Sequence, residues 1–331
     1  MTAPSRRGVL AGAWTTALTG ALTAACGGAE AGAPVADTPH PAVTQEQAAR
    51  ILRSVDAALD QSFTARDPRR LGRRVTGPAA RTVGARLRVA AKLGRTVQAP
   101  GPLALRRLVL PASGDWPRWF AAAGEVTGQP TPVVRVLRSV SAREPFGLWG
   151  ELLLLPGATL PALASPQTGT PLFAPDQSGL VATPTDVLSR YAKALTATTP
   201  GRPAEGFALD QFREQVAGQL AADRRTLGQI ADVDTVHRPS AADGMLALRT
   251  ADGGALVVAA LEQLYRVRVR QAGGPPVNLD ADLAALAGVP RVARSLQRTA
   301  VELLAFHVPP ARGGQIRLIA AAKGDVSAVG S

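Results

Sequence analysis

The spacing of apolar residues changes from helical to strand-like twice along this chain of 331 residues, and this constrains the fold more than any other feature. The first predicted helix carries apolar residues three or four positions apart: Ile51, Leu52, Val55, Ala58, Leu59 and Phe63. Thr44, followed by Gln47, forms a capping-box pattern that predicts where this helix begins. A short helix from Pro68 and a longer one between Pro78 and Gly94 complete the first helical part.

Strand-like segments follow these helices. They are rich in β-prone residues and are separated by Pro, Gly, Ser and Asp: Leu103–Leu110, Trp119–Val126, Val133–Val140 and Leu148–Leu155. Helices followed by antiparallel strands indicate an α+β domain, which we expect over residues 43–163. Residues 164–183 are rich in Pro, Thr, Ser and Gly, and this composition predicts a linker.

The same order of elements repeats from residue 184 to residue 331, which predicts a second α+β domain. Thr185 is expected to cap one helix, and a longer helix is expected over Phe207–Ile230. Strands are predicted at Thr235–Arg238, Met245–Thr250, Leu256–Leu264, Tyr265–Arg270, Leu296–Val308 and Gln315–Ala322. Asp252-Gly253-Gly254 is a hairpin-turn signal, and residues 275–289 predict a short inserted helix. The repeat is one of architecture rather than of sequence.

Residues 1–25 have the pattern of a cleaved export signal. Arg6 and Arg7 supply a positive start, and no charged residue occurs from Val9 to Ala25. That run is shorter than a membrane-spanning helix requires and is diluted by Thr and Gly. The segment from Ser5 to Leu10 resembles the twin-arginine export motif, although the general secretory route stays open.

Cys26 is the predicted lipidation site. The segment Leu22-Thr23-Ala24-Ala25-Cys26 resembles a bacterial lipobox, and Cys26 is the only cysteine of the chain, so it has no intrachain disulfide partner. Residues 26–42 are then expected to form a lipidated, flexible tether. Two or more acyl chains are enough for stable anchoring, which predicts a location at the extracytoplasmic face of the cell membrane.

The charge of the chain limits its partners. The formal net charge is +12, and all but three of the 37 basic residues are arginine, as a GC-rich genome encodes by default. The positive charge is compatible with anionic lipid or cell-wall polymer as a partner, and another surface protein is a third possibility. Aromatic residues make up 4% of the chain, which argues against the stacking surfaces of nucleic-acid-binding proteins.

The chain resembles uncharacterised actinobacterial lipoproteins built from two tandem nuclear-transport-factor-2-like (cystatin-like) domains. The resemblance rests on the start of the first helix at Gln47–Leu52, on Trp116–Phe120, and on the strands at Glu302–Phe306 and Ile316–Ala321. It implies helices packed on a curved antiparallel sheet in each domain. Because that fold hosts isomerase-type enzymes, ligand binders and interaction modules, it does not imply one function.

A fold of this kind forms a cone whose mouth can hold a ligand, and six residues are candidates to line such a pocket: Trp119, Trp149, Tyr191, Asp210, Tyr265 and His307. Aromatic residues this dense in a sheet are more often core, and His307 is more often a satisfied strand residue than a base. His237 is expected at an exposed strand end.

No catalytic motif, metal-ligand spacing or cofactor motif occurs in the sequence. We therefore expect a non-enzymatic binding or scaffolding module. The alternative is an isomerase- or hydrolase-like enzyme with its pocket in the second domain.

Overall fold

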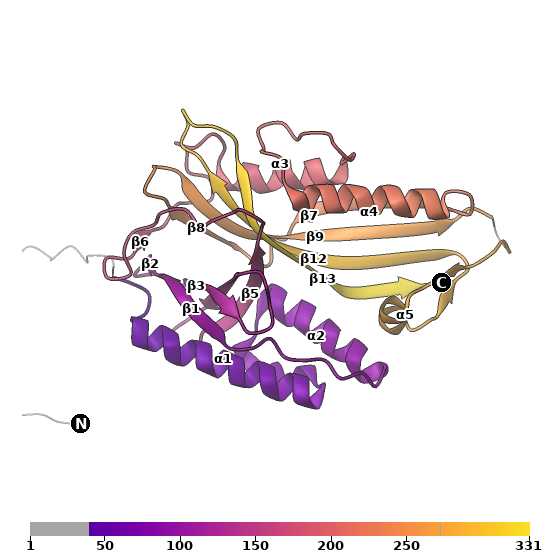
Figure 1. The fold of residues 1–331 in the computed structure, drawn as a ribbon, viewed down its shortest axis with the longest axis horizontal. Coiled ribbons are helices and arrows are strands. Elements are labelled where there is room, and N and C mark those ends of the chain that lie inside the picture. The colour runs from indigo at the N-terminus through magenta and orange to yellow at the C-terminus, as the bar shows by residue number, and fades with distance from the viewer. Residues whose placement is uncertain (1–39, 272) are drawn as a thin grey trace, which may run out of the picture. The chain divides into compact units, whose positions relative to one another are not determined.

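One large antiparallel sheet runs through both halves of the chain (Figure 1). The computed structural model describes residues 40–271 and 273–331. Within them, nine strands form this sheet in the order β1-β3-β4-β5-β13-β12-β9-β7, with β8 paired to β9. The α+β class predicted from the sequence is confirmed.

The first half begins with helices and continues with strands, as predicted. Its elements are α1 (Gln45–Ala65), the 3-10 helix η1 (Pro68–Arg74), α2 (Gly77–Lys92), β1 (Leu103–Val109), β2 (Pro111–Ala112), β3 (Arg118–Val126), β4 (Val133–Ser139) and β5 (Gly147–Leu154). The capping box at the start of α1 is present in full, because the Thr44 hydroxyl accepts from Gln47 N and the Gln47 side chain accepts from Thr44 N. These short-range signals are therefore confirmed.

The second half repeats the order. It contains β6 (Thr170–Pro171), α3 (Pro184–Thr196), α4 (Gln211–Leu227), β7 (Ala231–Pro239), β8 (Met245–Arg249), β9 (Ala255–Val269), β10 (Val277–Asn278), α5 (Ala281–Ala287), β11 (Arg291–Val292), β12 (Ser295–Val308) and β13 (Arg317–Gly330). Three expectations are corrected. Thr183, not Thr185, caps α3; α4 begins only after its cap Asp210; and the strands expected on either side of Leu264 are one strand, β9.

Helices cover the outer faces of both sheet halves, with α1 and α2 on one side and α3 and α4 on the other (Figure 1). Between the two halves of the sheet lies a third apolar cluster, here called the central core, which includes Trp119, Trp149, Leu152, Val258, Leu303 and Ile319. The central core takes side chains from both halves of the sequence. Its burial therefore stabilises both halves together.

The segment expected to be a linker, residues 164–183, lies against both halves. Its strand β6 pairs in parallel with β2 of the first half, and Phe173 N donates to Ala247 O of the second half. Phe173 is itself buried. The described residues consequently form one compact unit.

The predicted export signal with Arg6 and Arg7, the lipidation site Cys26, and all of the tether up to residue 39 lie outside the described residues. Within residues 40–271 and 273–331, no helix has the length and apolarity that crossing a membrane requires.

Candidate functional site

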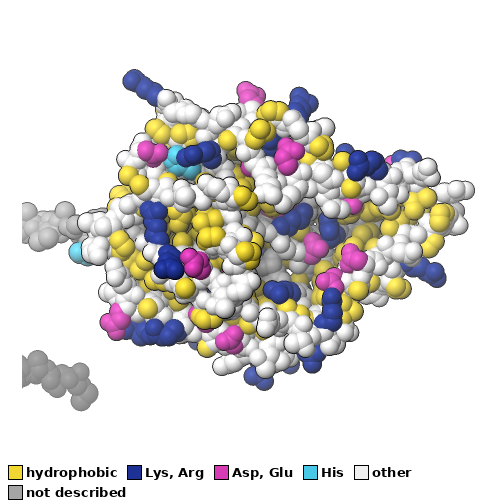
Figure 2. All heavy atoms as spheres, in the orientation of Figure 1, with side chains coloured by type: hydrophobic (Ala, Val, Ile, Leu, Met, Phe, Trp, Pro, Cys, Tyr) yellow, Lys and Arg dark blue, Asp and Glu magenta, His cyan; other side chains and the backbone are white. Residues whose placement is uncertain are grey.

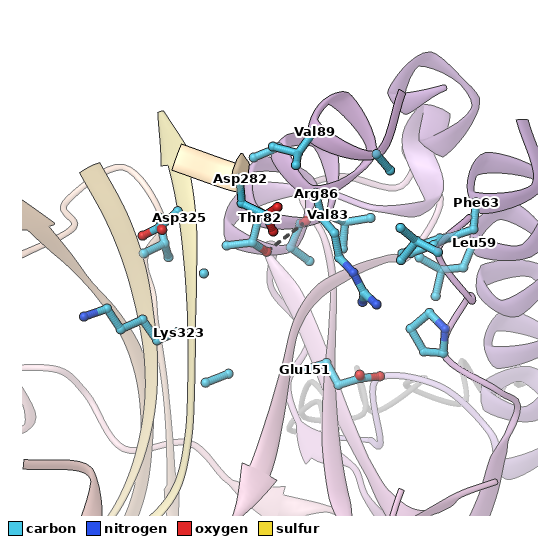
Figure 3. A pocket seen from close by; sticks show the side chains of 18 of the residues that line it. Leu59, Phe63, Thr82, Val83, Arg86, Val89, Glu151, Asp282, Lys323 and Asp325 are labelled. Carbon is cyan, nitrogen blue, oxygen red and sulfur yellow. Dashed lines mark hydrogen bonds between the residues drawn. The ribbon is translucent and has the colours of Figure 1, made fainter. Parts of the chain in front are cut away.

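A cavity of about 600 Å³ opens where β5 and β13 separate (Figure 3). The two strands pair only at Ala320 with Leu154 and at Ala321 with Leu153, after which β13 continues without β5 beside it. Helix α2 packs across the resulting gap. We call this space between α2, β5 and β13 the wedge cavity; its volume falls within the range of small-ligand sites.

The walls of the wedge cavity are mainly apolar. The helices contribute Leu59, Phe63, Val83 and Val89, and the strands contribute Leu148, Leu153, Val301, Leu303 and Ala322. Close packing restricts two of its lining residues: a Cβ atom on Gly150 would lie 2.9 Å from Cδ1 of the lining residue Leu303, and one on the lining residue Gly324 would lie 2.9 Å from Thr82 Cγ2. The cavity is thus built by precise contacts at both strands.

Arg86 is the charged side chain that α2 directs into this apolar space. Its guanidinium lies 5.2 Å from the Phe63 ring centroid and, in Figure 3, extends toward Glu151. Arg86 is exposed as a whole, but partial desolvation by the cavity walls lowers its pKa, and the negative charge of Glu151 partly opposes that effect. In the part of the chain that the structure describes, Arg86 makes neither a hydrogen bond nor an ion pair within the usual distances.

Glu151, by contrast, belongs to a closed ion-pair network beneath the cavity. Arg135 on β4 is fully buried and donates from Nε to Glu151 at 2.7 Å, from Nη1 to Asp56 at 2.5 Å and from Nη2 to Gly101 O at 3.0 Å. Burial raises the pKa of Asp56, although the adjacent Arg135 acts in the opposite direction. Both carboxylates are therefore held by Arg135, and among the described residues Arg86 is the charged lining group without an ion-pair partner.

The β13 side of the wedge cavity consists of an open strand edge. Residues 322–325 line the cavity. The side chains of Lys323 and Asp325 extend to the opposite side of the strand from Arg86 and Glu151 (Figure 3). There Lys323 Nζ lies 3.6 Å from Glu302 Oε1. At Lys323, therefore, the main chain of β13 lines the cavity rather than the side chain.

The rim of the cavity joins α2 to the inserted helix α5. Arg95, just after α2, forms an ion pair with Asp282, and Lys92 Nζ donates to Ala285 O at 2.7 Å. Asp282 and Leu286 of α5 both line the cavity. The short helix predicted from residues 275–289 is therefore present and closes one side of the opening.

The two tryptophans proposed as pocket residues lie together in the central core. Trp119 and Trp149 pack edge to face with their ring centroids 5.3 Å apart, and Trp149 Nε1 donates to Asp243 O at 3.0 Å. Neither lines the wedge cavity. Their structural role agrees with the preference for aromatic residues in sheet cores.

Of the four other candidates, the structure brings only Tyr191 and Asp210 together. The Tyr191 hydroxyl donates to Asp210 Oδ1 at 2.8 Å, and the same carboxylate caps α4. Burial is the main reason that the pKa of both groups is raised. Asp210 is thus tied into the start of a helix rather than directed into a cavity.

Tyr265 and His307 are far from each other. Tyr265 is paired with Arg298 of β12, nine residues before His307, so the two are roughly 30 Å apart along the sheet. Tyr265 donates to Asp223 Oδ2 at 2.9 Å, and His307 Nε2 lies 2.9 Å from Asp252 Oδ2. These candidates therefore do not form one site.

His237, expected at an exposed strand end, is buried instead. Its Nδ1 lies 2.9 Å from Glu302 Oε2, and its Nε2 lies 3.4 Å from the Thr235 hydroxyl. This order of hydroxyl, imidazole and carboxylate resembles a nucleophilic triad, but the adjoining space is only about 20 Å³, room for about one water molecule. The alternation of Ala231, Val233, Thr235 and His237 was the signal that these side chains share one covered face of β7.

Charged side chains elsewhere are mixed in sign. On the face shown in Figure 2, basic and acidic groups are interspersed rather than gathered into one basic patch. Arg270 with Asp232 and Arg238 with Glu262 are examples of such pairing. In residues 40–271 and 273–331, no group of three or more His, Cys, Asp or Glu side chains has the arrangement needed to hold a metal ion.

A family model matches residues 39–330, nearly the whole described part of the chain, and its description is "Domain of unknown function (DUF8094)". The chain therefore belongs to this family. No curated protein and no solved structure matches it.

Proposed function

We propose that the protein is a non-enzymatic binding module whose wedge cavity takes a small ligand with an apolar body and an anionic head. One observation carries the proposal: Arg86 is an exposed residue whose side chain lines a mainly apolar cavity, and it has no hydrogen-bonding or ion-pair partner in the described residues. A ligand carboxylate at this position would pair with the unpaired guanidinium through charge-assisted hydrogen bonds, and an apolar ligand body that excludes water from the cavity would strengthen that contact.

The apolar walls support the same ligand class. Leu59, Phe63 and Val83 on the helices face Leu153 and Leu303 on the strands, so an apolar ligand body would be enclosed on both sides. Removal of such a body from water supplies non-directional affinity, while Arg86 supplies orientation. Since Glu151 and Asp56 are both held by Arg135, neither is free to serve as a general base, which favours binding over catalysis.

Titration with decanoate and with decan-1-ol tests this proposal by calorimetry. Decanoate should bind the full chain, and Arg86→Met should weaken it by about 10- to 100-fold, the value of a charged hydrogen-bonded contact. Arg53→Met, which removes an exposed arginine from α1, is the matched control and should leave binding unchanged. Equal affinity of the acid and the alcohol for wild type and Arg86→Met would contradict the role assigned to Arg86.

We also propose that the module is exported and held at the extracytoplasmic membrane face by lipid on Cys26, as in the actinobacterial lipoproteins that it resembles. Each half would correspond to one nuclear-transport-factor-2-like unit. The arrangement of helices on one face of antiparallel strands in each half supports this assignment. Membrane lipid is then a partner through the N-terminus, and anionic lipid, wall polymer or a surface protein remain candidate partners of the folded part.

Cell fractionation with intact-mass measurement of the N-terminus tests the anchoring. Wild type should be membrane-bound with acyl mass on Cys26, and Cys26→Ala should be released or left unprocessed, because the site of acyl attachment is lost. Identical behaviour of both proteins, each retaining residues 1–25, would contradict the export and lipidation proposal.

A further inference from the structure

The open edge of β13 presents unpaired main-chain groups to the wedge cavity. Ile319 O accepts a hydrogen bond from Leu155 N, so residue 319 directs its main chain toward β5. Ile319 lies at a β-bulge, so the direction is taken from β5: Leu153, two residues before Leu155, faces β13 and pairs with Ala321, and Lys323, two residues beyond Ala321, faces the same edge. Ala321 has Leu153 as its partner, whereas pairing with β5 has ended before Lys323.

The open stretch is short and bounded. On one side it begins where β5 leaves β13, and on the other side Arg88 Nη2 donates to Val326 O at 3.2 Å. Residues 322–325 between these limits line the wedge cavity. This length corresponds to pairing with about two or three residues of an extended chain.

We infer that the ligand of the wedge cavity is a short extended peptide with a free C-terminal carboxylate, which pairs with the β13 edge at Lys323 and places its carboxylate on Arg86. This inference rests on the proposed function and names its ligand class. Strand addition to an exposed edge and capture of a terminal carboxylate are established modes of peptide recognition.

A peptide would form hydrogen bonds with the open strand edge of the cavity, which a simple amphipathic acid would leave without a partner. Its N–H and C=O groups would compensate the main chain of Lys323, which a hydrocarbon tail cannot do. Side chains that alternate along it would meet the apolar walls at Leu153 and Leu303. Arg86 complements its single terminal charge.

The probe is acetyl-Ala-Leu-Val with a free carboxylate, compared by calorimetry with its C-terminal amide, with forms N-methylated at one residue each, and with decanoate. The free acid should bind the full chain, and the amide should bind about tenfold or more weakly. Arg86→Met should remove most of the difference between acid and amide, whereas the exposed-surface control Arg53→Met should preserve it.

N-methylation tests the strand pairing without altering the protein. Methylation should weaken binding about tenfold at residues whose N–H faces β13 and have little effect at the neighbouring residue, because directions alternate. Uniform tolerance of N-methylation would overturn the inference. If decanoate binds and none of the peptides does, the peptide inference is overturned and the proposed function stands. If neither decanoate nor any peptide binds, the peptide inference and the proposed function are both overturned.

Discussion

At the scale of single residues, Arg135 shows how a charge is accommodated inside this fold. Each of its three guanidinium nitrogens has an acceptor, in Asp56, Glu151 and Gly101 O. The network connects α1 with β4 and β5 below the wedge cavity. Removing Arg135 leaves two partly buried carboxylates without their shared partner.

We predict that Arg135→Met lowers the free energy of unfolding by about 3–5 kcal/mol in urea titrations, because Asp56 and Glu151 would lose their shared partner. The control Arg53→Met removes an exposed arginine and should change stability by less than about 0.5 kcal/mol. Adding Asp56→Asn and Glu151→Gln to Arg135→Met should recover part of the loss. Equal stability of wild type and Arg135→Met would show that the network contributes nothing.

At the scale of elements, the approach of α2 to β13 depends on a glycine. A Cβ atom at Gly324 would lie 2.9 Å from Thr82 Cγ2 and 3.0 Å from Thr82 Cβ. A side chain here would push the helix away from the strand and change the shape of the wedge cavity, whose lining includes both residues.

We predict that Gly324→Ala destabilises the protein by about 1–3 kcal/mol through this overpacking, and that adding Thr82→Ala restores part of the loss. Gly218 provides a control of opposite sign. It lies inside α4, and a Cβ atom added there would have no neighbouring atom within 4 Å, so Gly218→Ala should stabilise by about 0.5–1 kcal/mol. Urea unfolding of Gly324→Ala, Thr82→Ala, their combination and Gly218→Ala measures both effects. If the losses of stability from Gly324→Ala and Thr82→Ala simply add in the combined variant, the contact between the two residues is not the cause.

Element boundaries were largely predictable because their signals are local. The capping box at Thr44 and the turn at Asp252-Gly253-Gly254 act within three or four residues, and both occur where predicted. Asp210 illustrates the limit of such reasoning. The sequence makes its side chain a candidate for a pocket, whereas in the structure it accepts from Arg213 N as the cap of α4.

At the scale of the whole molecule, the central core unites the two halves. Trp149 and Leu152 come from the first half, and Val258 and Leu303 from the second, and all are buried in the same cluster. Separation of the halves would expose this apolar surface on both. The stability of each half therefore depends on the other.

We predict one cooperative unfolding transition for residues 40–331. In urea, fluorescence of the tryptophans, all of which precede residue 150, reports on the first half and the central core, and second-derivative absorbance of Tyr191 and Tyr265 reports on the second half. The two curves should coincide in midpoint and slope, because a shared core is lost in one step. Separate midpoints would indicate two domains that unfold independently.

The sequence alone determined the α+β class, the order of helices and strands, and most of their ends, since hydrophobic spacing, caps and turn residues act over short distances. It did not reveal the wedge cavity. Arg86, Leu153, Leu303 and Lys323 belong to four separated segments, and nothing in their neighbours along the chain indicates that they meet. Tertiary structure decided this, because the cavity exists only where β5 leaves β13 and α2 packs over the gap.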